Sequence, residues 1–234
     1  MRRATDTPPN EDLRTARGVL AVGLLSAALW LLVMIGAMLV LAGCAQAASA
    51  ATVRVPTASA TYRLQVERAS AEYFGLSASP ARLAAQLHQE SGWRDDAQSA
   101  YAIGLAQFTP ATAQWLPEVC PELGEFDPWD AAQSFRAAAC YDAWLLNQMT
   151  GASACDRWAF ALSAYNGGAG WGRRDRRRAS ASGADQHRWF GHVEAHSARA
   201  SWAFAENRAY VRRILLVLEP AHVLDGWSGE AVCP

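Results

Sequence analysis

The stretch SPARLAAQLHQESGW, residues 79–93, indicates the fold class of this chain most directly. Its opening Ser-Pro pair is typical of a helix start, because serine caps free backbone N–H groups and proline suits the first helical position. Leu83, Leu87 and Glu90 then follow at the spacing of one helix face. The stretch therefore predicts a helix through Glu90 with a mainly apolar face that carries one carboxylate.

Similar signals outward along the chain predict further helices. From Tyr62 onward there is no convincing strand alternation and no internal repeat. The other expected helices cover residues 110–115, 131–149, 157–166 and 206–218, the last ended by Pro220. We expect an all-α domain with short connections and one long polar connection over residues 170–183.

The N-terminal part has a different composition. Arginines stand at positions 2, 3, 14 and 17, and no charged residue follows until Arg54. The apolar stretch of roughly 24 residues is long enough to span a bilayer, and the arginines before it place the N-terminus in the cytoplasm. The expected parts are a cytoplasmic n-region (1–17), a transmembrane anchor or lipoprotein signal (18–42), a linker rich in Ala, Ser and Thr (43–62), and a folded domain (63–234).

Cys44 ends the run Leu41-Ala42-Gly43-Cys44, which is similar to the processing box of bacterial lipoproteins. Two interpretations stay open. The segment is an uncleaved anchor in the inner membrane, or it is a cleaved signal whose product carries lipid on Cys44 and reaches the outer membrane. In both, the folded domain faces the periplasm, whereas a buried helix of a cytosolic protein fits the arginine asymmetry poorly.

The composition limits the classes of function. The 234 residues include ten Trp and six Tyr, and 51% are hydrophobic, which excludes a disordered chain of low hydrophobicity. The net charge is −1, so the chain has no basic excess with which to attract nucleic acid. We expect no nucleic acid among its partners, and the sequence names no protein partner.

Four cysteines remain after Cys44, in a compartment that oxidises thiols. They are Cys120, Cys140, Cys155 and Cys233. Four cysteines allow three pairings, and free buried thiols are the alternative. Short loop closure mildly favours Cys120–Cys140, which would leave Cys155–Cys233 to tie down the C-terminus, but the pairing stays open at this point.

Glu90 is the first candidate for chemistry. It shares the apolar face of its helix and lies in the last turn, where the helix dipole disfavours an anion. Both effects raise the pKa of a carboxyl group, which a general acid at neutral pH requires. The plain alternative is a helix-end glutamate that reaches into solvent.

Amide and aromatic side chains from other segments could complete a sugar site. Tyr165 lies on the apolar face of one expected helix, and Glu206 and Tyr210 share an inward face of another. Gln107 and Asn166 stand beside glycines, on turns that can present a side-chain amide. Aromatic rings suit the faces of sugars and amides suit N-acetyl groups, although any one such pair alone is more often core packing.

Four short blocks carry a resemblance to a known family. They are Glu90-Ser91-Gly92-Trp93, Gly104-Leu105-Ala106-Gln107, Ala164-Tyr165-Asn166-Gly167-Gly168 and Glu206-Asn207-Arg208-Ala209-Tyr210-Val211. In these blocks and their order the chain resembles the catalytic domain of the soluble lytic transglycosylases, a family related to goose-type lysozymes. The resemblance implies an all-α, lysozyme-like catalytic domain in residues 63–234. Two details depart from the family pattern: Ala106 stands where methionine is commoner, and the interval between the first two blocks is one residue short.

The resemblance also implies roles for single residues. Glu90 matches the single catalytic acid and base of the family, which makes the chain an expected enzyme, and Ser91 matches the hydroxyl beside it. The residues that match the walls of the glycan groove are Gln107, Tyr165, Asn166, Tyr210 and Glu206, the last as a buried carboxylate that is structural or touches the substrate. The resemblance implies no metal and no cofactor.

The implied reaction cleaves the β-1,4 bond between N-acetylmuramic acid and N-acetylglucosamine in the glycan strands of peptidoglycan. With a single carboxylate, the muramyl 6-hydroxyl attacks its own C1 and leaves a 1,6-anhydromuramyl end. Two other functions stay open. One is a goose-lysozyme-like muramidase in which Asp95 or Asp96 activates water, and the other is a non-catalytic peptidoglycan-binding subunit of an envelope or phage lysis apparatus.

Two further features have simpler interpretations. His192 and His196 are four residues apart, as zinc ligands often are, but no third ligand follows at metal spacing, so we expect no metal. The arginine-rich run at 173–178 is most simply a solvated loop, and contact with muropeptide carboxylates or anionic lipid is the alternative. The same run resembles phage- or prophage-borne members of the family.

Overall fold

The computed structural model describes residues 53–234. The expected n-region, the anchor or signal segment and Cys44 lie outside the described residues. Within residues 53–234, no helix is both long enough and apolar enough to cross a membrane. The first described helix, α2 (Ser59–Phe74), begins inside the range that the sequence assigned to the linker. Its first turns are linked to the C-terminal segment, because Arg63 Nη1 donates to the Gly226 carbonyl at 2.7 Å.

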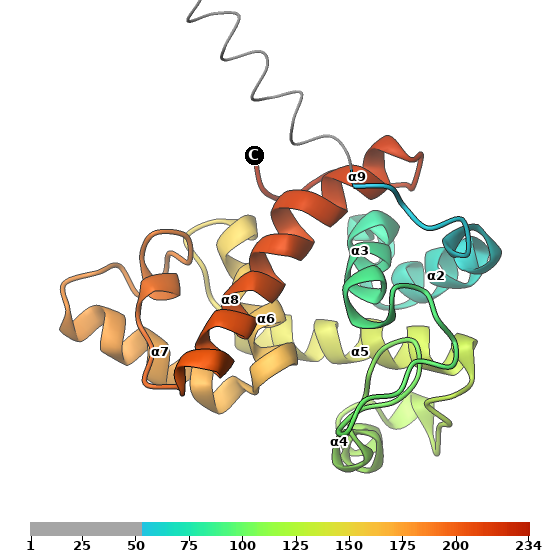
Figure 1. The fold of residues 1–234 in the computed structure, drawn as a ribbon, viewed down its shortest axis with the longest axis horizontal. Helices are drawn as coiled ribbons and strands as arrows, with labels where there is room; N and C mark the ends of the chain where they lie inside the picture. The colour runs from blue at the N-terminus through green and yellow to red at the C-terminus, as the bar shows by residue number, and fades with distance from the viewer. Residues whose placement is uncertain (1–52) are drawn as a thin grey trace, which may run out of the picture. The chain divides into compact units, whose positions relative to one another are not determined.

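Every regular element in residues 53–234 is helical, which confirms the all-α prediction (Figure 1). The α-helices after α2 are α3 (Pro80–Ser91), α4 (Pro110–Trp115), α5 (Ala131–Gln148), α6 (Ala154–Gly167), α7 (Ala169–Ala181), α8 (Ser201–Arg213) and α9 (Glu219–Leu224). Short 3-10 turns are η1 (Gly75–Ser77), η2 (Leu116–Glu118), η3 (Pro121–Leu123) and η4 (Val193–Ala195), and η5 (Ile214–Leu218) is a π-helical turn.

Side-chain caps explain where several helices start. Thr109, Asp130 and Ser153 each accept a hydrogen bond from the backbone N–H three residues further on. Because Ser153 is such a cap, α6 begins at Ala154, three residues before the expected start at 157. Ser79 precedes α3 as expected, but its side chain makes no capping bond.

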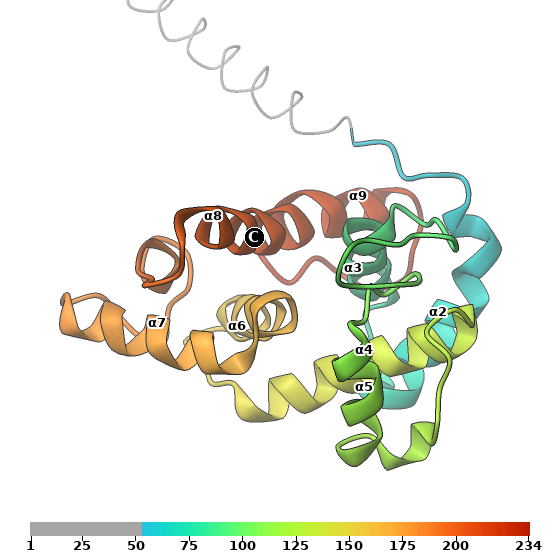
Figure 2. The same ribbon diagram turned by 60° about the horizontal axis from the view of Figure 1, so that its bottom comes forward.

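Three hydrophobic clusters form the core of residues 53–234, and the two larger ones both include residues of α3. The first joins α3 to α2 and α5 and includes Leu83, Leu87 and Phe135. The second includes Ala85 of α3 together with Ile214 of η5 and residues of α6 and α8. Figure 2 shows α8 and α9 nearly in line above α6, with α3 beside α9 and α5 below. Helix α3 therefore packs into both of the larger clusters.

The prediction of a long polar connection over residues 170–183 is wrong, because most of it forms α7. Arginine and alanine are good helix formers, and this segment is rich in both. Its buried positions are Gly172, Asp175 and Ala179, which share one helix face. None of the three is a large apolar residue, so the hydrophobic pattern gave no helix signal.

The prediction that Pro220 ends the last helix is also wrong. Helix α8 continues through η5 into α9, which ends at Leu224. The backbone N–H of Glu219 donates to the Ile214 carbonyl, five residues back. Proline breaks the four-residue pattern of an α-helix, and the wider π-helical turn before it lets the chain stay helical.

The cysteines pair as short loop closure favoured. Disulfides join Cys120 to Cys140 and Cys155 to Cys233. The second closes a loop across 78 residues and fixes the C-terminal segment to the start of α6. Cross-links of this kind stabilise a fold mainly by limiting the unfolded chain.

Candidate active site

The end of α3 opens into a cavity of about 480 Å³ with Glu90 on its wall. The loop before α4, the end of α6 and one side of α8 supply the other walls. The lining residues are Gln89, Glu90, Ser99, Tyr101, Ala102, Gln107, Phe108, Thr109, Thr112, Tyr141, Tyr165, Asn166, Glu206, Ala209, Tyr210 and Arg213. Of the residues singled out in the sequence, the cavity brings together Glu90, Gln107, Tyr165, Asn166, Glu206 and Tyr210.

Glu90 is held by one hydrogen bond, in which the Tyr210 hydroxyl donates to Glu90 Oε1 at 2.5 Å. No ion pair to this carboxyl group is found among residues 53–234. Burial raises the pKa of Glu90 to about 8; the bond from Tyr210 opposes the rise, and the charges of Asp142 and Glu206 add to it. Glu90 therefore holds its proton at neutral pH, as a general acid requires.

Tyr165 fixes the loop that carries Gln107. Its hydroxyl donates to the Ala106 carbonyl at 3.0 Å. Burial and the charge of Glu90 raise the pKa of Tyr165 well above its ordinary value, so it remains a neutral donor. The Ala106 side chain is buried in the core and does not line the cavity, so the smaller residue at this position leaves the cavity wall unchanged.

The backbone of this loop depends on Gly104 and Gln107. Gly104 has a φ of 75°, and a Cβ there would lie 1.9 Å from the Pro128 carbonyl oxygen. Gln107 has a φ of 49°, which is rare for a residue with a side chain. Its Nε2 donates to the carbonyls of Ala97 at 3.1 Å and Gly104 at 2.8 Å. Both amide N–H groups are thus used within the loop, and the side-chain oxygen is the atom that Gln107 can offer a ligand.

Asn166 and Glu206 form part of the cavity rim, where Asn166 Nδ2 donates to Glu206 Oε1 at 3.5 Å. The prediction of a buried, inward Glu206 is wrong, because its side chain is exposed. Helix α3 packs against η5 and α9 rather than against the first turns of α8. Tyr210 is therefore covered, whereas Glu206, one turn earlier, stays open to solvent.

Ser91 follows Glu90 but does not line the cavity. Its hydroxyl donates to the Leu87 carbonyl at 3.1 Å and accepts from the Trp93 backbone N–H at 3.1 Å. These bonds complete the last turn of α3. Ser91 therefore holds the turn that carries Glu90, and its hydroxyl is used in doing so.

Asp95 and Asp96 are exposed, and neither lines the cavity. The carboxylate that sequence reasoning missed is Asp142, which is 1% exposed in α5 and accepts from Gln86 Nε2 at 3.3 Å. Burial raises its pKa to about 8. A signal was present, because Asp142 follows Ala138 at the helical spacing that identified Glu90.

The histidines do not share a helix face, because His192 precedes and His196 follows the short turn η4. His192 Nδ1 accepts a hydrogen bond from the Asp185 backbone N–H at 3.1 Å. The group of potential metal ligands in residues 53–234 is Cys120, Glu122 and Cys140. Its two sulfurs form a disulfide, so they are not the thiolates that bind metal.

Comparison with known proteins finds a family model over the part of the chain that holds most of this site. Residues 74–188 match the model described as "Transglycosylase SLT domain". The matched segment contains Glu90, Gln107, Tyr165 and Asn166.

Curated relatives named membrane-bound lytic murein transglycosylase F match a similar region. The protein from Actinobacillus succinogenes is 35% identical over 109 residues, which are 46% of this chain and 21% of the relative. The protein from Maricaulis maris is 33% identical over 147 residues, with 58% of this chain and 31% of the relative covered. The chain thus spans less than a third of the length of these relatives.

Among solved structures, the 70 kDa soluble lytic transglycosylase of Escherichia coli has a similar fold, with a TM-score of 0.50. The two are 22% identical, and the match covers 73% of this chain and 25% of the other. At this level of identity the match shows the fold alone. It confirms the lysozyme-like helical fold that the sequence blocks implied.

Proposed function

We propose that the chain, whose residues 74–188 match the transglycosylase SLT domain model, is a peptidoglycan lytic transglycosylase with Glu90 as acid and base. The names of its relatives support the activity. The observation that carries the proposal is the state of Glu90, which borders an open cavity, has no paired cation in the described chain and holds its proton at neutral pH. Such a group can give that proton to a leaving oxygen.

The reaction then follows in two proton transfers. Glu90 donates its proton to the oxygen of the β-1,4 bond after the muramyl sugar, and the C1–O bond breaks through an oxocarbenium-like state. The glycan fragment with the new 4-hydroxyl leaves. The Glu90 carboxylate takes the proton of the muramyl 6-hydroxyl, whose oxygen bonds to C1. This closes the 1,6-anhydro ring and restores the protonated acid without consuming water.

Asn166 and Gln107 supply complementary groups for the substrate amide in this proposal. The Asn166 NH2 group is at the rim and donates hydrogen bonds, whereas Gln107 has its oxygen to offer as an acceptor. An N-acetyl group carries one carbonyl acceptor and one N–H donor. A bound 2-acetamido group could therefore be held in place beside the developing positive charge on C1.

A muramidase is the second candidate, because Glu206 is a second carboxylate on the same cavity. A hydrolase of this type needs such a group to activate water. Glu206 is exposed and bonded to Asn166, a setting that leaves it in contact with solvent. The two reactions differ in their products, so one experiment separates them.

The test is digestion of purified sacculi by the full-length chain in detergent, with the released muropeptides read by mass spectrometry. We expect products one water lighter than hydrolysis products, their loss in Glu90→Gln, and their persistence in the matched control Glu206→Gln. Products of full hydrolytic mass that disappear in Glu206→Gln would establish the muramidase instead. Binding to sacculi without any release would indicate a non-catalytic binding subunit.

We also propose that residues 18–42 hold the domain, residues 63–234, at the membrane with its cavity in the periplasm. Support comes from the arginine asymmetry and from relatives named membrane-bound. Membrane fractionation and metabolic labelling with palmitate test this. Label that disappears in Cys44→Ala indicates a lipoprotein, and membrane association without label indicates an uncleaved anchor. Recovery of the whole chain in the soluble fraction would contradict both.

A further inference from the structure

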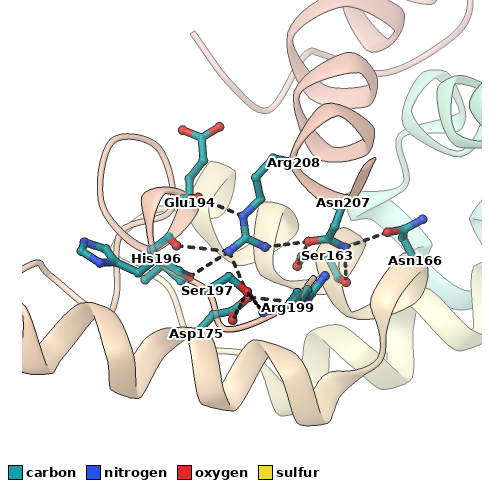
Figure 3. Close-up of polar contacts among 10 residues, drawn as sticks. Ser163, Asn166, Asp175, Glu194, His196, Ser197, Arg199, Asn207 and Arg208 are labelled. Carbon is teal, nitrogen blue, oxygen red and sulfur yellow. Dashed lines mark hydrogen bonds and ion pairs between the residues drawn. The ribbon is translucent and has the colours of Figure 1, made fainter. Parts of the chain in front are cut away.

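A buried polar cluster lies behind Asn166, between α6, α7 and α8, and the proposed mechanism makes no use of it (Figure 3). Asp175 of α7, at one end, is fully buried. Its Oδ2 lies 2.9 Å from Arg208 Nη2 and 3.5 Å from Arg199 Nη2. Its Oδ1 accepts from the Ser197 hydroxyl at 2.8 Å. Two guanidinium groups therefore share one carboxylate in the interior.

Arg208 sets the polarity of the cluster, because a guanidinium group donates hydrogen bonds and accepts none. Besides Asp175, it donates to the carbonyls of Glu194 at 2.9 Å and His196 at 3.0 Å. Its Nη1 donates to the Asn207 side-chain oxygen at 2.8 Å. The end of the Asn207 amide that faces Arg208 must therefore be the oxygen, which removes the usual ambiguity between the two ends of an amide.

This orientation determines that of Asn166. The Asn207 oxygen also accepts from the Ser163 hydroxyl at 2.8 Å, so its NH2 group points toward α6. That group donates to the Ser163 carbonyl at 2.9 Å and to Asn166 Oδ1 at 2.8 Å. Because the Asn166 oxygen is used there, its own NH2 group is the end directed to the cavity rim and Glu206.

Close packing limits the amides to this arrangement. A Cβ at Gly167 would lie 2.5 Å from Arg199 Nη1 and 3.0 Å from Asn207 Nδ2, so only glycine lets both groups approach. Asn207 and Arg208 are 1% and 6% exposed, which leaves them little access to water as an alternative partner. Breaking one bond would leave a buried polar group unpaired, which is unfavourable.

We infer that Asn207 and Arg208, held by Asp175, are positioning residues that present Asn166 to the glycan as a hydrogen-bond donor. The inference rests on the proposed function, because it assumes that a glycan occupies the cavity. A donor at the rim suits the carbonyl oxygen of a 2-acetamido group. A sugar with a hydroxyl in that place lacks this acceptor, so the cluster sets a preference for N-acetylated chains.

Asn207→Asp tests the inference with almost no change in shape. A carboxylate keeps the bond from Arg208 but has no hydrogen to donate, so the Asn166 amide turns and offers its oxygen to the cavity. The added negative charge lies beside two guanidinium groups that share one carboxylate, which favours folding of the variant. Ser163→Ala is the matched control, because it removes a bond to the same Asn207 oxygen and leaves the polarity intact.

Binding is measured on the full-length chain in detergent, with Glu90→Gln present in every sample to stop turnover. The probes are chitotetraose and cellotetraose, two neutral β-1,4 chains that differ in the 2-acetamido group. We expect tighter binding of chitotetraose, a loss of this preference of about tenfold in Asn207→Asp, and a change within about twofold in Ser163→Ala. Asn166→Ala removes the preference alone, and adding Asn207→Asp to it brings no further change, because both act through one amide.

Three results overturn the inference: no preference in the parent protein, an unchanged preference in Asn207→Asp, or an equal loss in Ser163→Ala. If Asn207→Asp does not fold, Asn166→Ala decides, and an unchanged preference there shows that Asn166 is not the donor. The outcome is separate from the proposed function. The probes report recognition of the acetamido group whether or not the chain releases anhydro products from sacculi.

Discussion

Two acidic side chains of this domain, the fully buried Asp175 and the half-buried Glu90 on the cavity wall, lie in opposite electrostatic surroundings. Asp175 is fully buried between the guanidinium groups of Arg208 and Arg199. Glu90 has a tyrosine hydroxyl as its hydrogen-bond partner, and the two charged groups that raise its pKa besides burial, Asp142 and Glu206, are both acidic. The first carboxylate is thus paired with two cations, whereas the second has no cation beside it in residues 53–234 and is stabilised as the protonated acid.

Charge pairing, more than burial, distinguishes Asp175, which has a structural role, from Glu90, the proposed acid. When a carboxylate that is fully paired with buried cations is removed, those cations are left unpaired. Its removal therefore lowers the stability of the fold first. An unpaired carboxyl group beside a cavity costs stability when it ionises, and it is ready to exchange its proton. Variants that change one setting and leave the other intact test this distinction.

The largest effect on stability is expected from Asp175→Asn. The change leaves Arg199 and Arg208 buried without a counter-charge, which typically costs about 3–5 kcal/mol. Urea unfolding followed by circular dichroism measures it. Glu72→Gln is the control, because it breaks a half-exposed pair with Arg136 that is worth about 1 kcal/mol or less. Equal losses in the two variants would show that the buried pair has no special weight.

Glu90→Gln is expected to stabilise the fold at alkaline pH. The folded-state pKa of Glu90 is raised to about 8, so the stability that its proton contributes is complete at acidic pH and is lost as pH rises toward 8. Removing the charge recovers on the order of 2 kcal/mol at pH 8, less than the full shift implies because the cavity admits water.

Urea unfolding of both proteins at pH 5, 6.5 and 8 measures the difference in the free energy of unfolding. The curves should lie closest together at the lowest pH, which is nearest to the ordinary pKa of 4.5, and furthest apart at the highest. Asp142, whose pKa is also raised to about 8, keeps some pH dependence in both proteins. Parallel curves at all three values would mean that Glu90 does not hold its proton.

Tyr210→Phe is expected to raise the pKa of Glu90 further and so to favour its protonated form. The hydroxyl donates to the Glu90 carboxyl group and lowers its pKa, so its removal raises that pKa further. The alkaline limb of the pH–rate profile then shifts upward, whatever happens to the maximal rate. Tyr141→Phe, on the same cavity, is the control and leaves the limb in place. A downward shift for Tyr210→Phe contradicts the assignment.

The position of Glu90 in the last turn of α3 could be predicted from the sequence because its signals are local. Its apolar helix face, the last helical turn and the adjoining Ser91 all lie within one short stretch. Periodicity placed Glu206 on the same helix face as Tyr210, and the family resemblance implied that it is buried. The burial was wrong, because exposure there depends on which part of α8, η5 and α9 is covered by α3. Periodicity identifies a helix face, but which part of that face is covered is a tertiary property.

Asp175 could not be predicted for the complementary reason. Its helix face has no large apolar residue, and its partners Arg199 and Arg208 lie more than twenty residues further along the chain. Nothing in the sequence joins them, because a buried ion pair has no fixed spacing. The paired carboxylate is therefore the less visible of the two, even though the fold depends on it more.

The smallest effect is expected from Glu206→Gln, which probes how far charge reaches Glu90 from the rim. The Glu206 charge raises the pKa of Glu90 as the weakest of the contributions named, and solvent screens it because the side chain is exposed. Its removal should lower the alkaline limb by less than about half a pH unit and leave kcat within about threefold. A loss of about a hundredfold or more would instead give Glu206 the role of a base that activates water. The cavity would then hold two catalytic carboxyl groups, Glu90 and Glu206. Neither forms an ion pair within residues 53–234, so charge pairing would still distinguish both from Asp175.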